Sequence, residues 1–153
     1  MKVSEVMAAH VEFIDAEATA EDAAALMGEL DVSALPVGTS EDLKGILTDR
    51  DILYRLVAEG RDPRRTKVIQ IATRLVFSCQ PDDDVSVAMD VMAAQNVRRL
   101  PVIDNAKRVV GWLTLSDLSR RLLVDSRVVQ QALHDLTDRI GPQAPPQAVT
   151  QPT

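Results

Sequence analysis

Two short segments of the chain carry residues that could bind a ligand at the start of a helix. Each begins with glycine, continues through residues of strand character and ends in Thr-x-x-Asp, at Gly45–Asp51 and at Gly111–Asp117. A helix start offers unpaired N–H groups to a phosphate, and a carboxylate can accept two hydrogen bonds from a cis-diol. The same residues also satisfy helix capping, with threonine as the N-cap and an acid in the first turn. The pattern alone leaves ligand binding and capping both open.

Other residue types with catalytic potential form no recognisable catalytic motif. His10 falls in a predicted loop and His134 on a predicted terminal helix, and neither accompanies a serine or cysteine in a nucleophile motif. Cys79 falls in a predicted strand, where it is most simply a small core residue. The acids Asp82–Asp84 precede a predicted helix, which they would cap. We therefore expect no catalysis, no resident cofactor and no metal site.

The two Thr-x-x-Asp segments belong to an internal repeat that covers most of the chain. A shift of 65 residues pairs Met27 with Met92, and it pairs Val32-x-x-Leu35-Pro36-Val37 with Val97-x-x-Leu100-Pro101-Val102. One extra residue in the turn at 104–108 then moves the shift to 66, which pairs Gly45, Thr48 and Asp51 with Gly111, Thr114 and Asp117. The chain is two copies of one unit.

Composition limits the classes of protein to which the chain could belong. It has 153 residues, of which 46% are hydrophobic, so two units of about 60 residues would have to share apolar surface to be stable. The formal charge of −6 argues against nucleic acid as a partner, and no apolar run is long enough to cross a membrane. With one cysteine and no signal-peptide core after Met1, we expect a cytoplasmic protein.

Hydrophobic periodicity predicts the same order of elements in both copies, strand–helix–strand–strand–helix. The elements expected in the first copy are a strand at Val11–Ile14, a helix capped by Thr19, strands at Ala34–Val37 and Leu43–Leu47, and a helix from Thr48 or Asp49. Those expected in the second are a strand at Leu75–Cys79, an Asp84-capped helix through Gln95, strands at Arg99–Ile103 and Val109–Leu113, and a helix from Thr114 or Leu115. The predicted fold class is α+β, two β-α-β-β-α units packed about a pseudo-twofold axis.

The predicted boundaries divide the chain into five segments. They are the first motif at 1–62, a linker at 63–66, the second motif at 67–124, a C-terminal helix at 125–141 and a disordered tail at 142–153. The extra helix, whose apolar pattern runs over Ser126–Ile140, has no counterpart in the first copy. Its apolar face would cover the flank of the module or a second subunit.

Val-x-x-Leu-Pro-Val, a turn and then Gly-Ile-Leu-Thr-x-x-Asp together resemble the cystathionine-β-synthase (CBS) domain, here as a tandem pair over Val3–Val124. The short format resembles bacterial two-CBS proteins, including those of the hypoxic-response type. The resemblance implies a non-catalytic module that senses energy or redox state and acts on a separate, unknown effector protein. Its ligand would be AMP, ADP, ATP or a related adenosine compound, bound in each cleft between the copies.

The resemblance also implies which residues would hold that ligand. Asp51 and Asp117 would take the ribose hydroxyls, and Thr48, Thr114 and Ser116 would lie near ribose or phosphate. The adenine would be held by the leading turn and first strand of the opposite copy, Val3–Ala9 with Val11–Phe13 for Asp117 and Val68–Thr73 with Val76–Phe77 for Asp51. The adenine-pocket residues are Met7, Val11, Val32, Val76 and Val97.

The two clefts are expected to differ in their affinity for phosphate. The second copy carries Arg98 and Arg99 where the first carries Ser33 and Ala34. Guanidinium groups bind phosphate through paired, charge-assisted hydrogen bonds. The hypothesis is that the Asp117 cleft binds a phosphorylated ligand more tightly than the Asp51 cleft; the alternative is that one arginine pairs with a local acid such as Asp104.

A second function from another class stays open. The chain could be an interaction or assembly protein that keeps the CBS fold without a ligand, since it carries no effector domain and has an extra helix. In either case the resemblance implies a homodimer formed through the helical faces.

Overall fold

A computed structural model describes residues 1–127, 130, 131, 134 and 135. The chain divides into two compact units, Met1–Leu118 and Ser119–Thr153, and the first unit contains nearly all of both repeats. Most of the predicted helix Ser126–Ile140 and all of the predicted tail at 142–153 lie outside the described residues. The sites considered below lie in the first unit.

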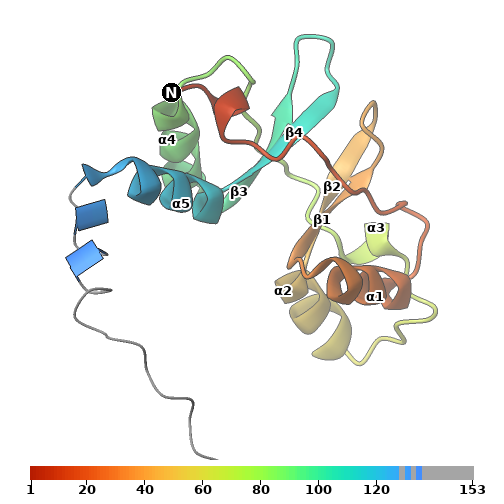
Figure 1. Ribbon diagram of the computed structural model, residues 1–153. Helices are drawn as coiled ribbons and strands as arrows, with labels where there is room; N and C mark the ends of the chain where they lie inside the picture. Colours follow the sequence, from red (N-terminus) through yellow and green to blue (C-terminus); the bar gives the residue numbers. More distant parts are fainter. Residues whose placement is uncertain (128–129, 132–133, 136–153) are drawn as a thin grey trace, which may run out of the picture. The chain divides into compact units, whose positions relative to one another are not determined.

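The two copies fold into the same order of elements (Figure 1). The first copy contains η1 (Val3–Glu5), α1 (Ala20–Leu30), β1 (Ala34–Gly38), β2 (Leu43–Thr48), α2 (Asp49–Ile52) and a π-helical turn, η2 (Leu53–Val57). The second contains α3 (Val68–Ile71), α4 (Val85–Gln95), β3 (Arg99–Ile103), β4 (Val109–Thr114) and α5 (Leu115–Asp125). The α+β class predicted from the repeat is confirmed.

Equivalent helices begin and end at equivalent residues. Thr19 caps α1, since its Oγ1 accepts a hydrogen bond from the Asp22 N–H at 3.1 Å, and Asp84 caps α4 by accepting one from the Ser86 N–H at 3.0 Å. Asp31 and Asn96 end these helices in the left-handed conformation, with φ of 54° and 52°. Short polar side chains tolerate that conformation, so both helices stop one turn before the next strand.

Each copy forms one two-stranded antiparallel sheet, with the same register in both. Leu35 faces Leu47 in the first, and Leu100 faces Leu113 in the second. The leading strands are much shorter than predicted. The segment Val11–Ile14 pairs with β1 only through Ile14, and Leu75–Cys79 pairs with β3 only through Cys79. The apolar pattern of these segments indicates that they are buried, but a β-strand also needs a neighbouring strand with which it forms consecutive backbone hydrogen bonds.

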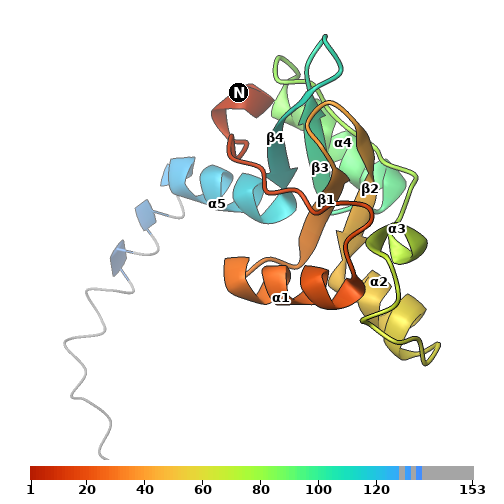
Figure 2. The same ribbon diagram turned by 90° about the vertical axis from the view of Figure 1, so that its right-hand side faces the viewer.

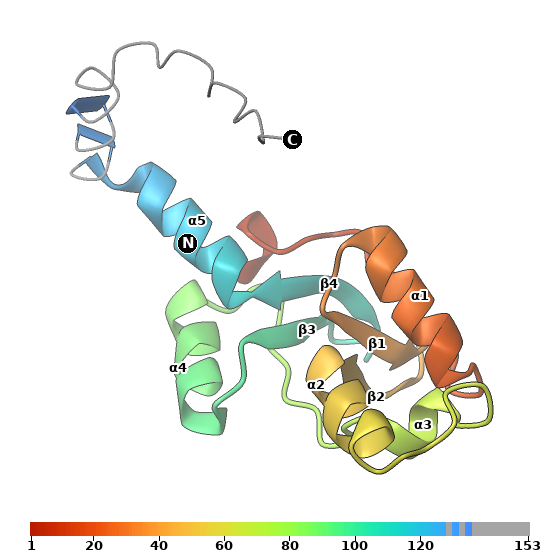
Figure 3. The same cartoon turned by 90° about the horizontal axis from the view of Figure 1, so that it is seen from below.

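The hydrophobic cores explain why neither copy would be stable alone. The core of the first copy contains Leu35 and Leu47 but also Val68 and Ile71 from α3. The core of the second contains Leu100 and Leu113 but also Val3 from the N-terminal segment, which is fully buried. Figures 2 and 3 both show α3 beside α2. The copies therefore exchange their leading segments, and each completes its core with residues of the other.

Candidate functional site

The backbones of the two copies meet at two equivalent places, each next to a Thr-x-x-Asp motif. Ile46 and Thr73 exchange two backbone hydrogen bonds of 2.9 Å, and Ala8 and Trp112 exchange two of 2.8 and 2.9 Å. The glycine that opens each motif allows this approach. A Cβ placed on Gly45 would lie 2.7 Å from the carbonyl oxygen of Thr73. The glycine three residues before each Thr-x-x-Asp motif is thus needed for contact between the copies.

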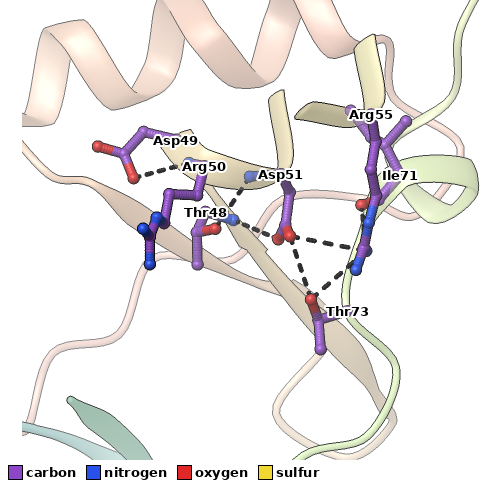
Figure 4. Close-up of polar contacts among 7 residues, drawn as sticks. All are labelled: Thr48, Asp49, Arg50, Asp51, Arg55, Ile71 and Thr73. Atoms are coloured by element: carbon purple, nitrogen blue, oxygen red, sulfur yellow. Dashed lines mark hydrogen bonds and ion pairs between the residues drawn. The ribbon is translucent and has the colours of Figure 1, made fainter. Parts of the chain in front are cut away.

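The carboxylate of Asp51 is buried and engaged by both of its oxygens (Figure 4). Oδ2 accepts a hydrogen bond from the Thr48 N–H at 2.9 Å, and Thr48 Oγ1 in turn accepts one from the Asp51 N–H at 3.2 Å. Oδ1 accepts a hydrogen bond from Thr73 Oγ1 at 3.2 Å and lies 3.6 Å from Nη1 of Arg55. This arginine also donates to the carbonyl of Ile71 at 2.9 Å. Asp51 therefore connects α2 to the leading segment of the second copy through its hydrogen bond with Thr73.

The carboxylate of Asp117 has fewer partners. Its Oδ2 accepts hydrogen bonds from the Thr114 Oγ1 at 2.5 Å and from the Thr114 N–H at 3.3 Å. The Asp117 N–H donates to Thr114 Oγ1 at 3.1 Å, which completes a capping arrangement like that of Asp51. Among the described residues, none donates a hydrogen bond to Oδ1 of Asp117. That oxygen can accept a hydrogen bond from a ligand without breaking one within the protein.

A cavity of about 590 Å³ lies between the two copies beside Thr48, and we call it the Thr48 cavity. Its apolar lining comprises Ile46, Leu75, Val76, Phe77 and Val97. Its charged and hydroxyl-bearing lining includes Thr48, Asp49, Arg50, Thr73, Arg98 and Arg99. Five of the predicted ligand residues thus come together here: Thr48, Val76, Val97, Arg98 and Arg99. Asp51 accepts a hydrogen bond from Thr73, a lining residue, and is not itself among the lining residues.

Arg99 links the second copy to the first at the edge of this cavity. Its Nη2 donates a hydrogen bond of 3.1 Å to the Ser33 hydroxyl, and the Ser33 carbonyl accepts one of 3.0 Å from the Asp49 N–H. Burial lowers the pKa of the Arg99 guanidinium, and the nearby Asp49 carboxylate acts in the opposite direction. Arg99 is therefore a half-buried cation at the start of α2.

The surroundings of Arg98 and Arg99 involve both copies. Asp104 pairs with Arg108 at 3.0 Å, and the Arg108 N–H is the main cause that lowers the pKa of Asp104, so neither Arg98 nor Arg99 is its partner. Their side chains line the cavity of the first copy's motif rather than serving Asp117 alone. The backbones of both arginines meet the second motif, because the Arg98 carbonyl accepts a hydrogen bond of 2.8 Å from the Leu115 N–H and Arg99 pairs with Thr114 across β3 and β4. The sequence could not show where the side chains of Arg98 and Arg99 lie, because contacts between the two copies determine their positions.

The remaining predicted residues lie in other surroundings. Met7 packs on Gly111, where a Cβ would come within 2.3 Å of its sulfur. Val32 is 41% exposed and lines a separate groove of about 580 Å³ with residues of α1 and α2. Val11 is partly exposed, and Ser116 is exposed in the first turn of α5. Six lining residues were not predicted as ligand residues from the sequence: Ser33, Ile46, Asp49, Arg50, Leu75 and Asn96.

The CBS domain model matches residues 3–58 and 68–124, which are the two copies described above. The chain belongs to the CBS domain family. Its relatives include the CBS domain-containing protein YhcV of Bacillus subtilis, 37% identical over 117 residues, or 76% of this chain and 82% of the relative. Hypoxic response protein 1 of Mycobacterium tuberculosis is 34% identical over 119 residues, covering 77% of this chain and 82% of that protein. The resemblance to two-CBS proteins is thereby confirmed.

A solved CBS structure supports the same assignment. The crystal structure of Hypoxic Response Protein I with two coordinated zinc ions has a TM-score of 0.70 and 33% identity, and the match covers 79% of this chain and 98% of that one. Within the described part of this chain, no cluster of three or more His, Cys, Asp or Glu residues could hold a metal ion. In the same residues, no helix is long and apolar enough to cross a bilayer.

Proposed function

We propose that this CBS pair is a non-catalytic regulatory module that binds adenosine compounds between its two copies and acts on a separate effector protein. Paired CBS domains generally bind adenosine ligands in regulatory roles, and stand-alone members are generally non-catalytic. The observation that carries the proposal for this chain is the Thr48 cavity, which combines an apolar lining with three guanidinium groups. The ligand would report energy or redox state through the packing of the copies.

The chemistry of the cavity suits a nucleotide. Its volume of about 590 Å³ lies within the range of about 300–1,000 Å³ usual for small-molecule pockets. Phe77, Val76 and Val97 offer the apolar surface and ring face on which an adenine base packs. Arg50, Arg98 and Arg99 supply positive charge for phosphate.

Roles for the motif residues form part of the same proposal. Asp117 would accept hydrogen bonds from the ribose hydroxyls at its site, with Thr114 and Ser116 beside it and Met7, Val11 and Val32 toward the adenine. Asp51, which does not line the Thr48 cavity, would do so there only after giving up its hydrogen bond from Thr73. Thr48 would contact ribose or phosphate directly.

Thermal unfolding against a ligand panel tests this function. The panel comprises AMP, ADP, ATP, NAD, S-adenosylmethionine and 5′-methylthioadenosine, with buffer as the blank. The last two compounds are those of a solved CBS pair at 24% identity and a TM-score of 0.73, a likeness that concerns the fold alone. A ligand specific for the folded state adds about 2.7 kcal/mol to the free energy of unfolding at a hundredfold excess over Kd.

The expected result is a rise in Tm with at least one adenosine compound, reduced in Asp117→Ala or Asp51→Ala when each variant is compared with its own ligand-free Tm. No rise with any compound, at concentrations up to the millimolar range, would refute ligand binding. It would favour the alternative, an assembly protein that keeps the fold without a ligand.

One observation favours assembly as a second role, whether or not a ligand binds. Leu53, Tyr54 and Val57 lie in η2 with exposed fractions of 55%, 63% and 62%. Exposed apolar side chains grouped on one short element are typical of a protein–protein contact. We propose a homodimer that covers them; light scattering should give twice the chain mass of 16.7 kDa, and a mass of one chain would refute it.

A further inference from the structure

The two copies are similar enough for their ligand-facing positions to be compared residue by residue. The Asp49 N–H donates to the Ser33 carbonyl in the first copy, and the Leu115 N–H donates to the Arg98 carbonyl in the second, at 3.0 and 2.8 Å. The bridges Ile46–Thr73 and Ala8–Trp112 are related in the same way. Each residue that lines the Thr48 cavity therefore has a counterpart in the repeat, and we call those counterpart positions, together with Asp117, the Asp117 site.

The lining of the Thr48 cavity is cationic. Arg50, Arg98 and Arg99 face one carboxylate, that of Asp49. Arg99 is held by the Ser33 hydroxyl, and the guanidinium of Arg50 lies 5.9 Å from the centre of the Tyr54 ring. Neither contact neutralises the positive charge, so the cavity attracts anions.

The counterparts at the Asp117 site reverse this balance. Ser33 and Ala34 stand in place of Arg98 and Arg99, and Ser116 stands in place of Arg50. Two neutral positions become acidic, because Glu12 is the counterpart of Phe77 and Asp31 that of Asn96, and one acidic position becomes neutral, because Leu115 is the counterpart of Asp49.

The counterpart positions of the Asp117 site contain one guanidinium, that of Arg98, which is the counterpart of Ser33. Glu12 contacts His10 at 2.6 Å, and its side chain is 49% exposed. At the counterpart positions this one guanidinium faces two carboxylates, those of Glu12 and Asp31, so their net charge is negative and would repel a phosphate.

We propose that the two sites divide their ligands by charge: the Thr48 cavity takes a phosphorylated adenosine compound, and the Asp117 site takes an adenosine compound without a phosphate. This division rests on the proposed function and adds the ligand class of each site. The carboxylates agree with it. Both oxygens of Asp51 are engaged within the protein, so binding at the Thr48 cavity depends on the phosphate contacts. Oδ1 of Asp117 can accept a ribose hydroxyl directly.

Calorimetric titration of the full chain with three probes tests the division. The probes are ATP, adenosine and inorganic tripolyphosphate, which carries the charge of ATP without the nucleoside. We expect ATP and tripolyphosphate to compete for one site, and adenosine to bind at a second site in protein that is already saturated with tripolyphosphate. The affinity for both anions should fall as salt is raised, while that for adenosine should stay unchanged.

Variants that install the residue of the other copy locate each site. Arg99→Ala gives position 99 the residue of position 34, and it should weaken ATP and tripolyphosphate about tenfold to a hundredfold, as expected for the loss of a charge-assisted hydrogen bond. Arg98→Ser gives the exposed position 98 the residue of position 33, and it replaces Arg99→Ala in the test if that variant fails to fold. Asp117→Ala should abolish the binding of adenosine and leave tripolyphosphate unchanged. Arg64→Ala, which removes an equal charge from an exposed linker residue, is the matched control.

The outcomes separate the division from the proposed function. If adenosine and ATP compete for the same site, or if Arg99→Ala and Arg98→Ser bind ATP as Arg64→Ala does, adenosine compounds still bind but the division by charge is overturned. Another outcome is that tripolyphosphate binds, adenosine does not bind, and ATP binds no more tightly than tripolyphosphate. In that case both the proposed function and the adenosine assignment of the Asp117 site are overturned.

Discussion

Gly45 should be the least replaceable residue of the first motif, for a reason unrelated to ligand chemistry. A Cβ at this position would lie 2.7 Å from the Thr73 carbonyl oxygen and 3.4 Å from its carbon, both backbone atoms that no rotamer change can move. Gly45→Ala therefore has to push β2 away from the leading segment of the second copy. The contact that would break is the Ile46–Thr73 bridge.

The expected cost follows from that bridge. Its two N–H···O bonds are both 2.9 Å long, and a backbone hydrogen bond contributes about 0.5–1.5 kcal/mol net, so Gly45→Ala should lose about 1–3 kcal/mol of unfolding free energy. For a chain of 153 residues, each kcal/mol corresponds to about 2–4 °C in Tm. Because Thr73 lines the Thr48 cavity, ligand-induced stabilisation should decrease as well.

Two other glycines provide matched controls for the same chemical change. At Gly111 the Cβ would meet Met7, whose side chain can rotate away, although the Ala8 carbonyl at 3.2 Å leaves little room. We expect a smaller cost there, about 1 kcal/mol. At Gly28, inside α1, a Cβ would meet nothing within 4 Å. Gly28→Ala should stabilise the protein by about 0.5–1 kcal/mol, because alanine favours a helix over glycine.

Urea unfolding monitored by circular dichroism measures all three variants, with the m-value checked for constancy. The predicted order of stability is Gly28→Ala, wild type, Gly111→Ala and then Gly45→Ala. A Gly45→Ala variant as stable as wild type would refute the claim that backbone contact between the copies dictates this glycine. A Gly111→Ala variant less stable than Gly45→Ala would refute the distinction between backbone and side-chain obstruction.

Three further predictions concern single polar or thiol groups. Thr73→Val should cost about 1–2 kcal/mol in urea unfolding, because it removes the hydroxyl that donates to the buried Asp51 carboxylate; an unchanged midpoint would show that this bond contributes nothing. The Ser86 N–H is the main cause that lowers the pKa of Asp84 from 3.8 to about 2, so the ionised form contributes stability above pH 3.8 that is lost as the pH falls toward 2. The stability difference between wild type and Asp84→Asn should shrink over that range, and a difference independent of pH would contradict the linkage. Burial raises the pKa of Cys79 from 9.0 to about 11, so iodoacetamide at pH 7.5 should label it only after unfolding, and equal labelling in folded and unfolded protein would contradict its burial.

Helices and strands were predicted best from the sequence where the residues that start, end and bury each element lie within or next to that element. The strand Arg99–Ile103 has the predicted bounds, and α4 begins after Asp84 and ends at Gln95 as expected. In these cases the cap and the alternation of apolar residues lie within the segment itself. The repeat added a second, independent instance of each pattern, which is why the CBS pair could be recognised before any contact was known.

Contacts between the copies could not be predicted in the same way. Arg99 and Ser33 are 66 residues apart, and nothing in either segment shows that their side chains meet. The same limit applies to the leading strands, since the partner of Ile14 is a single residue of β1. Aligning the copies position by position would have identified Phe77 and Asn96 as counterparts of Glu12 and Asp31, although not which of them face a cavity.

Capping and ligand binding, which the Thr-x-x-Asp pattern left open, do not exclude one another in this structure. Both aspartates cap their helices, since each accepts a hydrogen bond from its threonine N–H with one oxygen. They differ in the second oxygen, which in Asp51 bonds to Thr73 and in Asp117 bonds to no described residue. The counterpart of Thr73 in the other copy is Ala8, which has no hydroxyl to donate, and the counterpart of Arg55 is Arg121, which pairs with Asp125 at 3.3 Å. These two differences outside the motif therefore commit Asp51 to a contact between the copies and leave Asp117 able to accept a ligand.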